Sequence, residues 1–127
     1  MASGPQPAKH MRIAIIDLGT NTFNLLVAER DANGTLRVLH SEEVPVFLGK
    51  GGIEKGLIAA DAFERGLNAL ERFSATAKQL GAERITGFGT SALRNARNAP
   101  AFVSAAKERF GFDIQVIPGD EEAALIL

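Results

Sequence analysis

Hydrophobic residues form short runs and alternate with polar residues over most of the first half of the chain. Residues 11–17 are rich in β-branched side chains, which predicts a buried strand. A second strand is expected over residues 23–30 and a third over 35–44. Between them, Asp31-Ala32-Asn33-Gly34 is typical of a tight turn, because Asn-Gly readily adopts positive φ angles. Short connections of this kind predict an antiparallel meander.

The pattern then changes to a helical period. A glycine-rich loop, FLGKGGIEKG, occupies residues 47–56. Over residues 60–80, apolar side chains recur at spacings of three and four, which places them on one helical face: Phe63, Leu67, Leu70, Phe73, Ala77, Leu80. Gly81 follows where a left-handed cap is favoured, so a long amphipathic helix is predicted.

Strands and helices alternate after this helix. Residues 84–90, RITGFGT, predict a fourth strand, and residues 91–99, SALRNARNA, a loop. A second helix is expected over about residues 100–110, because Asn98 precedes it, Pro100 stands in its first turn and Gly111 follows it.

A fifth strand over residues 113–117 and a last helix over residues 119–127 complete the prediction. The element order β-β-β-α-β-α-β-α predicts an α/β fold, with a five-stranded mixed sheet, a three-strand antiparallel meander and flanking helices. The last helix ends on Leu125, Ile126 and Leu127, an apolar triplet. We therefore expect residues 11–127 to be the first domain of a longer, two-domain protein.

Composition excludes several kinds of site. The chain has 127 residues, of which 46% are hydrophobic, so it is long enough for one domain with a core. Fourteen basic and fifteen acidic residues give a net charge of −1. That balance provides no electrostatic field for nucleic acid or for an anionic membrane, and neither is expected as a partner.

The chain has no cysteine, which excludes disulfides, thiolate metal sites and a cysteine nucleophile. Absence of cysteine is typical of the cytosol, and a cytoplasmic location is expected. Residues 1–10 lack the apolar core of a signal peptide, and we interpret them as a disordered leader.

The first candidate site interrupts two strands with small polar residues. Gly19 lets backbone N–H groups approach an anion, and Thr20, Asn21 and Thr22 add short polar side chains. Asp17, at the end of the first strand, is a candidate ligand for a divalent cation. The alternative is an ordinary polar hairpin whose Asp and Asn bind their own backbone. Spacing alone leaves both interpretations open.

Two further clusters follow. Thr90 and Ser91 supply hydroxyl groups, and Arg94 supplies a planar guanidinium that suits phosphate oxygens. Locally, a helix start with a solvated arginine is the simpler interpretation. Asp120, Glu121 and Glu122 form an acidic first helical turn, which the helix dipole alone explains. A glutamate turned into a cleft would instead accept a proton from water as a general base.

Together these segments resemble one protein family. AIIDLGTNTFNLLVAE, FLGKGG, RGLNALERF, GTSALRNARNAPAFV and VIPGDEEAALIL follow one another with the spacing of the exopolyphosphatase/guanosine pentaphosphate phosphohydrolase (Ppx/GppA) family. The resemblance covers residues 12–127. It implies a ribonuclease H-like domain of the actin-like ATPase superfamily, here the N-terminal domain.

The resemblance also implies roles. Gly19, Thr20, Asn21 and Thr22 would hold phosphoryl groups, with Asp17 near a magnesium ion or another divalent cation. Arg94, with Ser91 beside it in the TSALR match, would bind an anionic oxygen.

Glu122 matches the catalytic carboxylate that activates water. The implied reaction is hydrolysis of terminal phosphoanhydride bonds of inorganic polyphosphate or guanosine pentaphosphate, by a protein that forms a homodimer at full length.

The sequence departs from the family at two points. Lys50 stands where an acid is common, so the resemblance assigns no metal or substrate role to that loop. The family's second phosphate loop is absent from these residues, and the chain therefore supplies one wall of a two-domain cleft. Two alternatives stay open: a phosphate-binding half-domain without turnover, and a kinase of the same superfamily.

Overall fold

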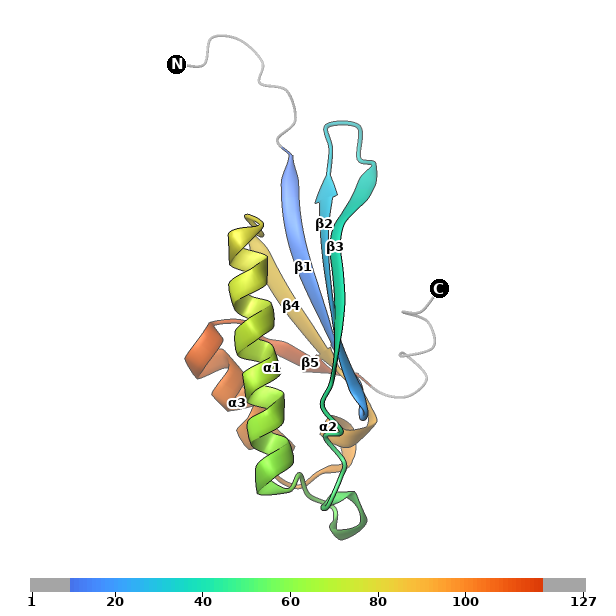
Figure 1. Cartoon of the computed structure of the whole chain (residues 1–127), viewed down its shortest axis with the longest axis vertical. Helices are drawn as coiled ribbons and strands as arrows, with labels where there is room; N and C mark the ends of the chain where they lie inside the picture. The colour runs from blue at the N-terminus through green and yellow to red at the C-terminus, as the bar shows by residue number, and fades with distance from the viewer. Residues whose placement is uncertain (1–9, 118–127) are drawn as a thin grey trace.

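Five strands form one mixed sheet in the computed structural model of this chain, which describes residues 10–117 (Figure 1). The expected leader up to residue 9, the expected last helix and the side chains of Ile53 and Ser91 lie outside the described residues. The strands are β1 (Met11–Leu18), β2 (Thr22–Arg30), β3 (Leu36–Pro45), β4 (Arg84–Gly89) and β5 (Ile114–Val116). Their spatial order is β3-β2-β1-β4-β5.

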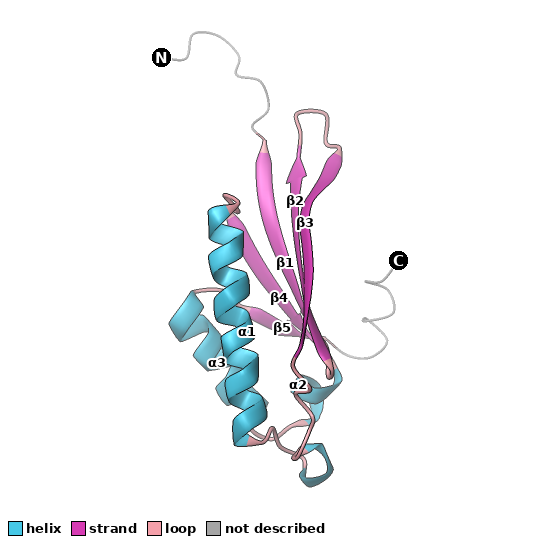
Figure 2. Ribbon diagram, in the orientation of Figure 1, coloured by secondary structure: helices cyan, strands magenta, loops and turns pink. Residues whose placement is uncertain are grey.

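The first three strands form the predicted antiparallel meander, and the last two extend it in parallel (Figure 2). In the turn between β2 and β3, the N–H of Gly34 donates to the Asp31 carbonyl, and the Asp31 carboxylate accepts from the N–H groups of Asn33 and Thr35. Gly34 has a φ of 83°, whereas Asn33 does not have a positive φ. The expected turn is therefore present with one left-handed residue.

The helices follow the expected order with two short additions. The long helix is α1 (Ala60–Gln79) and the later one is α3 (Ala99–Phe110). A short 3-10 helix, η1 (Ile53–Lys55), lies in the glycine-rich loop. The expected loop after β4 was wrong in part, because its first half is a helix, α2 (Ser91–Asn95). In the described part of the chain, no helix has both the length and the apolar character needed to cross a membrane.

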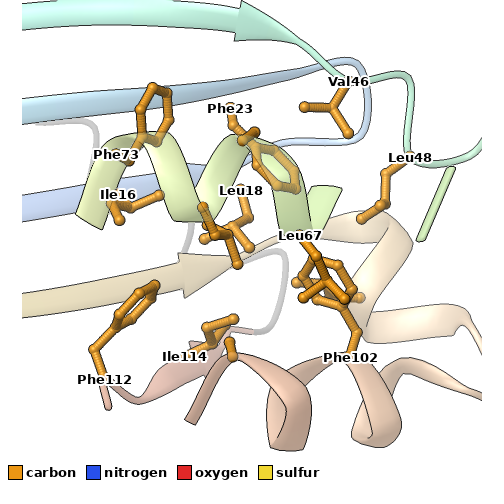
Figure 3. Packing of buried hydrophobic residues seen from close by; sticks show 14 of the residues in the cluster. Ile16, Leu18, Phe23, Val46, Leu48, Leu67, Phe73, Phe102, Phe112 and Ile114 are labelled. Atoms are coloured by element: carbon orange, nitrogen blue, oxygen red, sulfur yellow. The ribbon is translucent and has the colours of Figure 1, made fainter. Parts of the chain in front are cut away.

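The core lies between the sheet and helices α1 and α3 (Figure 3). Alternation places Ile16 and Leu18 of β1 on this face, where both side chains are fully buried. Phe102 of α3 contacts Phe63 of α1 edge to face, with ring centroids 5.2 Å apart. Gly66 permits this approach, since a Cβ there would lie 2.8 Å from the Phe102 ring.

The opposite face of the sheet carries the other half of the alternation. Asp17 and Leu26 are exposed there, and Ile13 and Ile15 are half-buried. A hollow of about 390 Å³ on this face has a mainly apolar lining, with Arg30 and Arg84 beside it. It includes none of the predicted site residues.

Candidate functional site

The predicted phosphate loop is the tight turn between β1 and β2, which pair antiparallel up to Leu18 and Phe23. Its N–H at Gly19 donates to the Thr22 carbonyl over 3.1 Å. A Cβ at position 19 would lie 2.9 Å from that same oxygen. Gly19 does not have a positive φ, so the turn requires glycine for space and not for its dihedral angles.

The carbonyl groups of this turn are held by the segment that follows β3. The N–H of Leu48 donates to the Thr20 carbonyl over 2.7 Å. The N–H groups of Val46 and Phe47 both donate to the Asn21 carbonyl, over 2.9 Å and 2.8 Å. These three bonds turn both carbonyl oxygens of the loop toward residues 46–48.

This arrangement fixes the direction of the loop's donors. In a planar trans peptide the N–H points opposite to the C=O, and every described peptide bond is trans. The N–H groups of Asn21 and Thr22 therefore point away from residues 46–48. Adjacent amides on one side of a turn are an arrangement that can hold an anion. The geometry is compatible with an anion at these amides, and the phosphate-loop interpretation stays a prediction.

The second predicted cluster lies beside this loop. Because β1 and β4 are parallel, their carboxyl ends share one edge of the sheet. Both the N–H and the hydroxyl of Thr90 donate to the Leu18 carbonyl, over 3.2 Å and 3.3 Å. Thr90 thus bonds the end of β4 to the end of β1. Ser91, the next residue, begins α2 next to the predicted phosphate loop.

Arg94 lies on α2 at the same edge. Its Nη1 donates to the carbonyl of Ile117 over 3.0 Å, and the N–H of Ile117 donates to the Gly89 carbonyl. Arg94 is exposed in the short helix α2, as the simpler interpretation of a helix start with a solvated arginine expected, and its Nη1 is also bonded to the residue that follows β5. Its role in anion binding stays a prediction. Glu122 follows Ile117 by five residues and lies outside the described residues, so its place in the site stays a prediction.

Asp17 is the predicted metal ligand, and its side chain is exposed at the penultimate position of β1. Within residues 10–117, no group of three or more His, Cys, Asp or Glu side chains could hold a metal ion. A cation at Asp17 would therefore need other ligands. Magnesium fits that requirement, because it commonly binds one or two carboxylates together with water and substrate phosphates.

Arg65 is a residue of this region that sequence patterns did not single out. From α1, its Nε donates to the Val46 carbonyl over 2.8 Å and its Nη2 to the Phe47 carbonyl over 3.2 Å. Phe47 has a φ of 51° and is the only non-glycine residue with a positive φ among those described. Arg65 thus holds a strained segment that in turn orients the phosphate loop. A long cationic side chain on an amphipathic helix gives no sequence signal for this role.

Asn98 was expected only as a helix-starting residue. It occupies that position before α3, but its side chain makes no capping bond. Instead its amide group pairs with the backbone of Ile58, accepting from the N–H over 2.8 Å and donating to the carbonyl over 3.0 Å. Asn98 thereby fixes the segment between the glycine-rich loop and α1.

The chain is similar to known proteins over most of its length. Residues 26–127 match the family described as the Ppx/GppA phosphatase family. A guanosine-5′-triphosphate,3′-diphosphate pyrophosphatase from Photobacterium profundum is 37% identical over 113 residues, which are 89% of this chain and 22% of that protein. The chain thus spans about a fifth of the length of that relative.

Two solved structures resemble the fold closely. An exopolyphosphatase from Cytophaga hutchinsonii has a TM-score of 0.87 and 37% identity, over 91% of this chain and 36% of that one. The Aquifex aeolicus member of the Ppx/GppA family has a TM-score of 0.83 and 27% identity, over 90% of this chain and 37% of that one. The mixed five-stranded sheet with flanking helices is confirmed as the fold of this group.

Proposed function

Because the chain belongs to the Ppx/GppA phosphatase family, we propose that it forms the phosphate-binding wall of a hydrolase that acts on terminal phosphoanhydride bonds. One observation carries this proposal: residues 46–48 hold the carbonyl groups of Thr20 and Asn21, which leaves adjacent loop amides directed the other way. Inorganic polyphosphate and guanosine pentaphosphate are the proposed substrates. Both end in a phosphoanhydride that such a loop would bind.

The chemistry is an in-line attack of water on the terminal phosphorus. A new P–O bond forms to the water oxygen, and the bridging P–O bond breaks and leaves its electron pair on the shortened chain. Glu122 accepts the proton of the attacking water. Amides of the loop stabilise the charge on the phosphoryl oxygens, and a preorganised donor of this kind typically contributes about 3–4 kcal/mol.

A divalent cation, when bound, would neutralise charge on the phosphate oxygens. Asp17 would supply its protein carboxylate, because this side chain is exposed at the end of β1 next to the loop. Arg94 would bind a phosphoryl oxygen of the same substrate. Ser91, at the start of the same helix, is the proposed hydroxyl partner.

The sequence left a kinase and a phosphate-binding half-domain open as alternatives to a hydrolase. The names of the similar proteins describe a pyrophosphatase and an exopolyphosphatase, which favours hydrolysis over a kinase reaction. For the 127-residue chain alone we propose phosphate binding without turnover, because it spans only 22% of that pyrophosphatase. A cytoplasmic location and a homodimer at full length stay predictions.

Phosphate release tests the assignment of Glu122. We expect the full-length protein that carries this chain to release phosphate from polyphosphate or guanosine pentaphosphate with magnesium. Glu122→Gln is expected to lower the rate by about 10²–10⁴-fold, which is the usual contribution of a general base. Substrate binding, measured by calorimetry, should remain close to wild type.

Glu64→Gln is a matched control, because Glu64 is an exposed glutamate on α1. Its rate should equal that of the wild type. Full activity of Glu122→Gln would remove Glu122 from the mechanism. No release of phosphate from either substrate by the wild-type protein would refute the hydrolase itself.

A further inference from the structure

The glycine-rich loop after β3 borders a hollow of about 360 Å³. Its lining is formed by Gly49, Lys50, Gly51, Gly52, Glu54 and Lys55. We propose that this hollow is a second anion subsite, in which Lys50 and Lys55 bind a further condensed-phosphate group of the molecule held at the phosphate loop. The proposal rests on the function proposed above.

The hollow adjoins the phosphate loop through the backbone. Leu48, whose N–H donates to the Thr20 carbonyl, is directly followed by Gly49. In the ribbon the glycine-rich loop and the turn between β1 and β2 lie toward the same end of the molecule (Figure 1). A substrate with several phosphate groups is therefore offered two loops at one end of the sheet.

The shape of the hollow is fixed by glycines. Gly51 and Gly56 have φ angles of 85° and 72°, which L residues rarely adopt. At Gly52 a Cβ would lie 2.4 Å from the Leu57 carbonyl oxygen. The loop thus needs glycine at these positions to fold back on itself.

The far end of the loop is held by the connection between α2 and α3. The N–H of Arg97 donates to the Gly56 carbonyl over 2.7 Å, and its Nη2 donates to the Lys55 carbonyl over 3.0 Å. Both ends of the loop are therefore bonded to neighbouring elements. A ligand would meet a formed hollow, so little conformational entropy would be lost on binding.

The charge at this hollow suits an anion. Lys50 and Lys55 are exposed, and neither takes part in an ion pair within residues 10–117. The exposed Arg97 lies next to Lys55, because its Nη2 donates to the Lys55 carbonyl, and Glu54 is the one carboxylate of the lining. Lysine ammonium groups bind phosphate as point charges, so they tolerate more than one position of the phosphate.

The ligand chemistry is condensed phosphate, and two sources supply it. One is the chain of a linear polyphosphate beyond its terminal groups. The other is the 3′-diphosphate of a guanosine 5′-triphosphate,3′-diphosphate, the compound in the name of a relative. Tripolyphosphate and GTP carry only the terminal groups, so each serves as the short counterpart of one source.

Calorimetric titration of the 127-residue chain tests the subsite. Wild type and the double variant Lys50→Gln/Lys55→Gln are titrated with tripolyphosphate, long-chain polyphosphate, GTP and guanosine pentaphosphate. An exposed ion pair contributes roughly two- to fivefold, so the double variant should lose about tenfold in affinity for a longer ligand. Its affinity for the short counterpart should change less than about twofold.

Lys78→Gln is the control, because Lys78 is exposed in the last turn of α1, away from this loop. Loss confined to long-chain polyphosphate identifies the linear chain as the source, and loss confined to guanosine pentaphosphate identifies the 3′-diphosphate. Equal losses for long and short ligands, or no loss at all, would overturn the subsite. If the full-length protein releases no phosphate but the lysine dependence persists, the proposed function fails and the subsite stands.

Discussion

Replacing Gly19 by alanine should separate anion binding from stability. The added Cβ would lie 2.9 Å from the Thr22 carbonyl oxygen, closer than such atoms normally approach. That oxygen also accepts the Gly19 N–H over 3.1 Å. To relieve the contact the turn must open, and this hydrogen bond weakens. The same opening moves the N–H groups that we expect to hold phosphate.

The expected free-energy changes differ in size. Loss of one backbone hydrogen bond costs about 0.5–1.5 kcal/mol of unfolding free energy. The gain that alanine usually brings by restricting the unfolded chain requires a position without strain, and here the Cβ meets a backbone oxygen. The destabilisation should therefore be at least about 0.5–1.5 kcal/mol. Hydrogen bonds to a charged group contribute about 1.5–3 kcal/mol each, so phosphate affinity should fall about ten- to a hundredfold.

The assay pairs urea unfolding with calorimetric titration of tripolyphosphate. Gly34→Ala is the matched control, because Gly34 lies in the distant turn between β2 and β3 with nothing near its missing Cβ and a φ of 83°. Alanine in that conformation costs about 1–2 kcal/mol, so this variant should lose stability and keep its affinity. Wild-type affinity in Gly19→Ala, with its fold retained, would refute the assignment of this turn as a phosphate loop.

Two further predictions concern the supporting structure. Asn98→Ala should lower the unfolding free energy by about 2–3 kcal/mol, because it removes both hydrogen bonds to the backbone of buried Ile58. Urea midpoints measure this loss, and an unchanged midpoint would contradict a stabilising role for Asn98. Hydrogen bonding from Arg12 lowers the pKa of Glu29 below its ordinary value of about 4.5. The ionised carboxylate therefore stabilises the fold above that pH, and this stabilisation is lost as the pH falls through the lowered pKa. Urea midpoints of wild type should therefore fall in acid and converge with those of Glu29→Gln, whereas curves that stay parallel would exclude Glu29 as a source of the pH dependence.

The sequence predicted the elements whose signals are local. Residues 60–80 show a helical period, and α1 begins at Ala60 with Gly81 in a left-handed cap at its end. The antiparallel meander followed from its short connections, whereas the spatial order of the later strands came only from the structure. The small helix α2 was missed, because five residues give too short a window for periodicity.

Side chains with distant partners were predicted less well. Asn98 has the right residue type and place for a helix cap, yet its amide binds Ile58, forty residues away. Thr90 was expected as a ligand donor, and its hydroxyl instead bonds to the Leu18 carbonyl. In both cases the local pattern fixed the position of the residue, and tertiary contacts decided what its side chain binds.

In the predicted phosphate loop, too, the local sequence predicts the turn, and tertiary contacts decide how its backbone groups are directed. The identities of Gly19, Thr20 and Asn21 are equally compatible with a polar hairpin and with an anion site, because both need small residues and a tight turn. The direction of the peptide groups decides whether amides are left to bind an anion, and that direction is set by the N–H groups of residues 46–48, which follow directly after β3. Those residues are held in turn by Arg65 of α1. The proposed anion-binding turn would thus be a property of the folded sheet and helix together, so a change at Arg65 should alter phosphate affinity although the loop sequence stays the same.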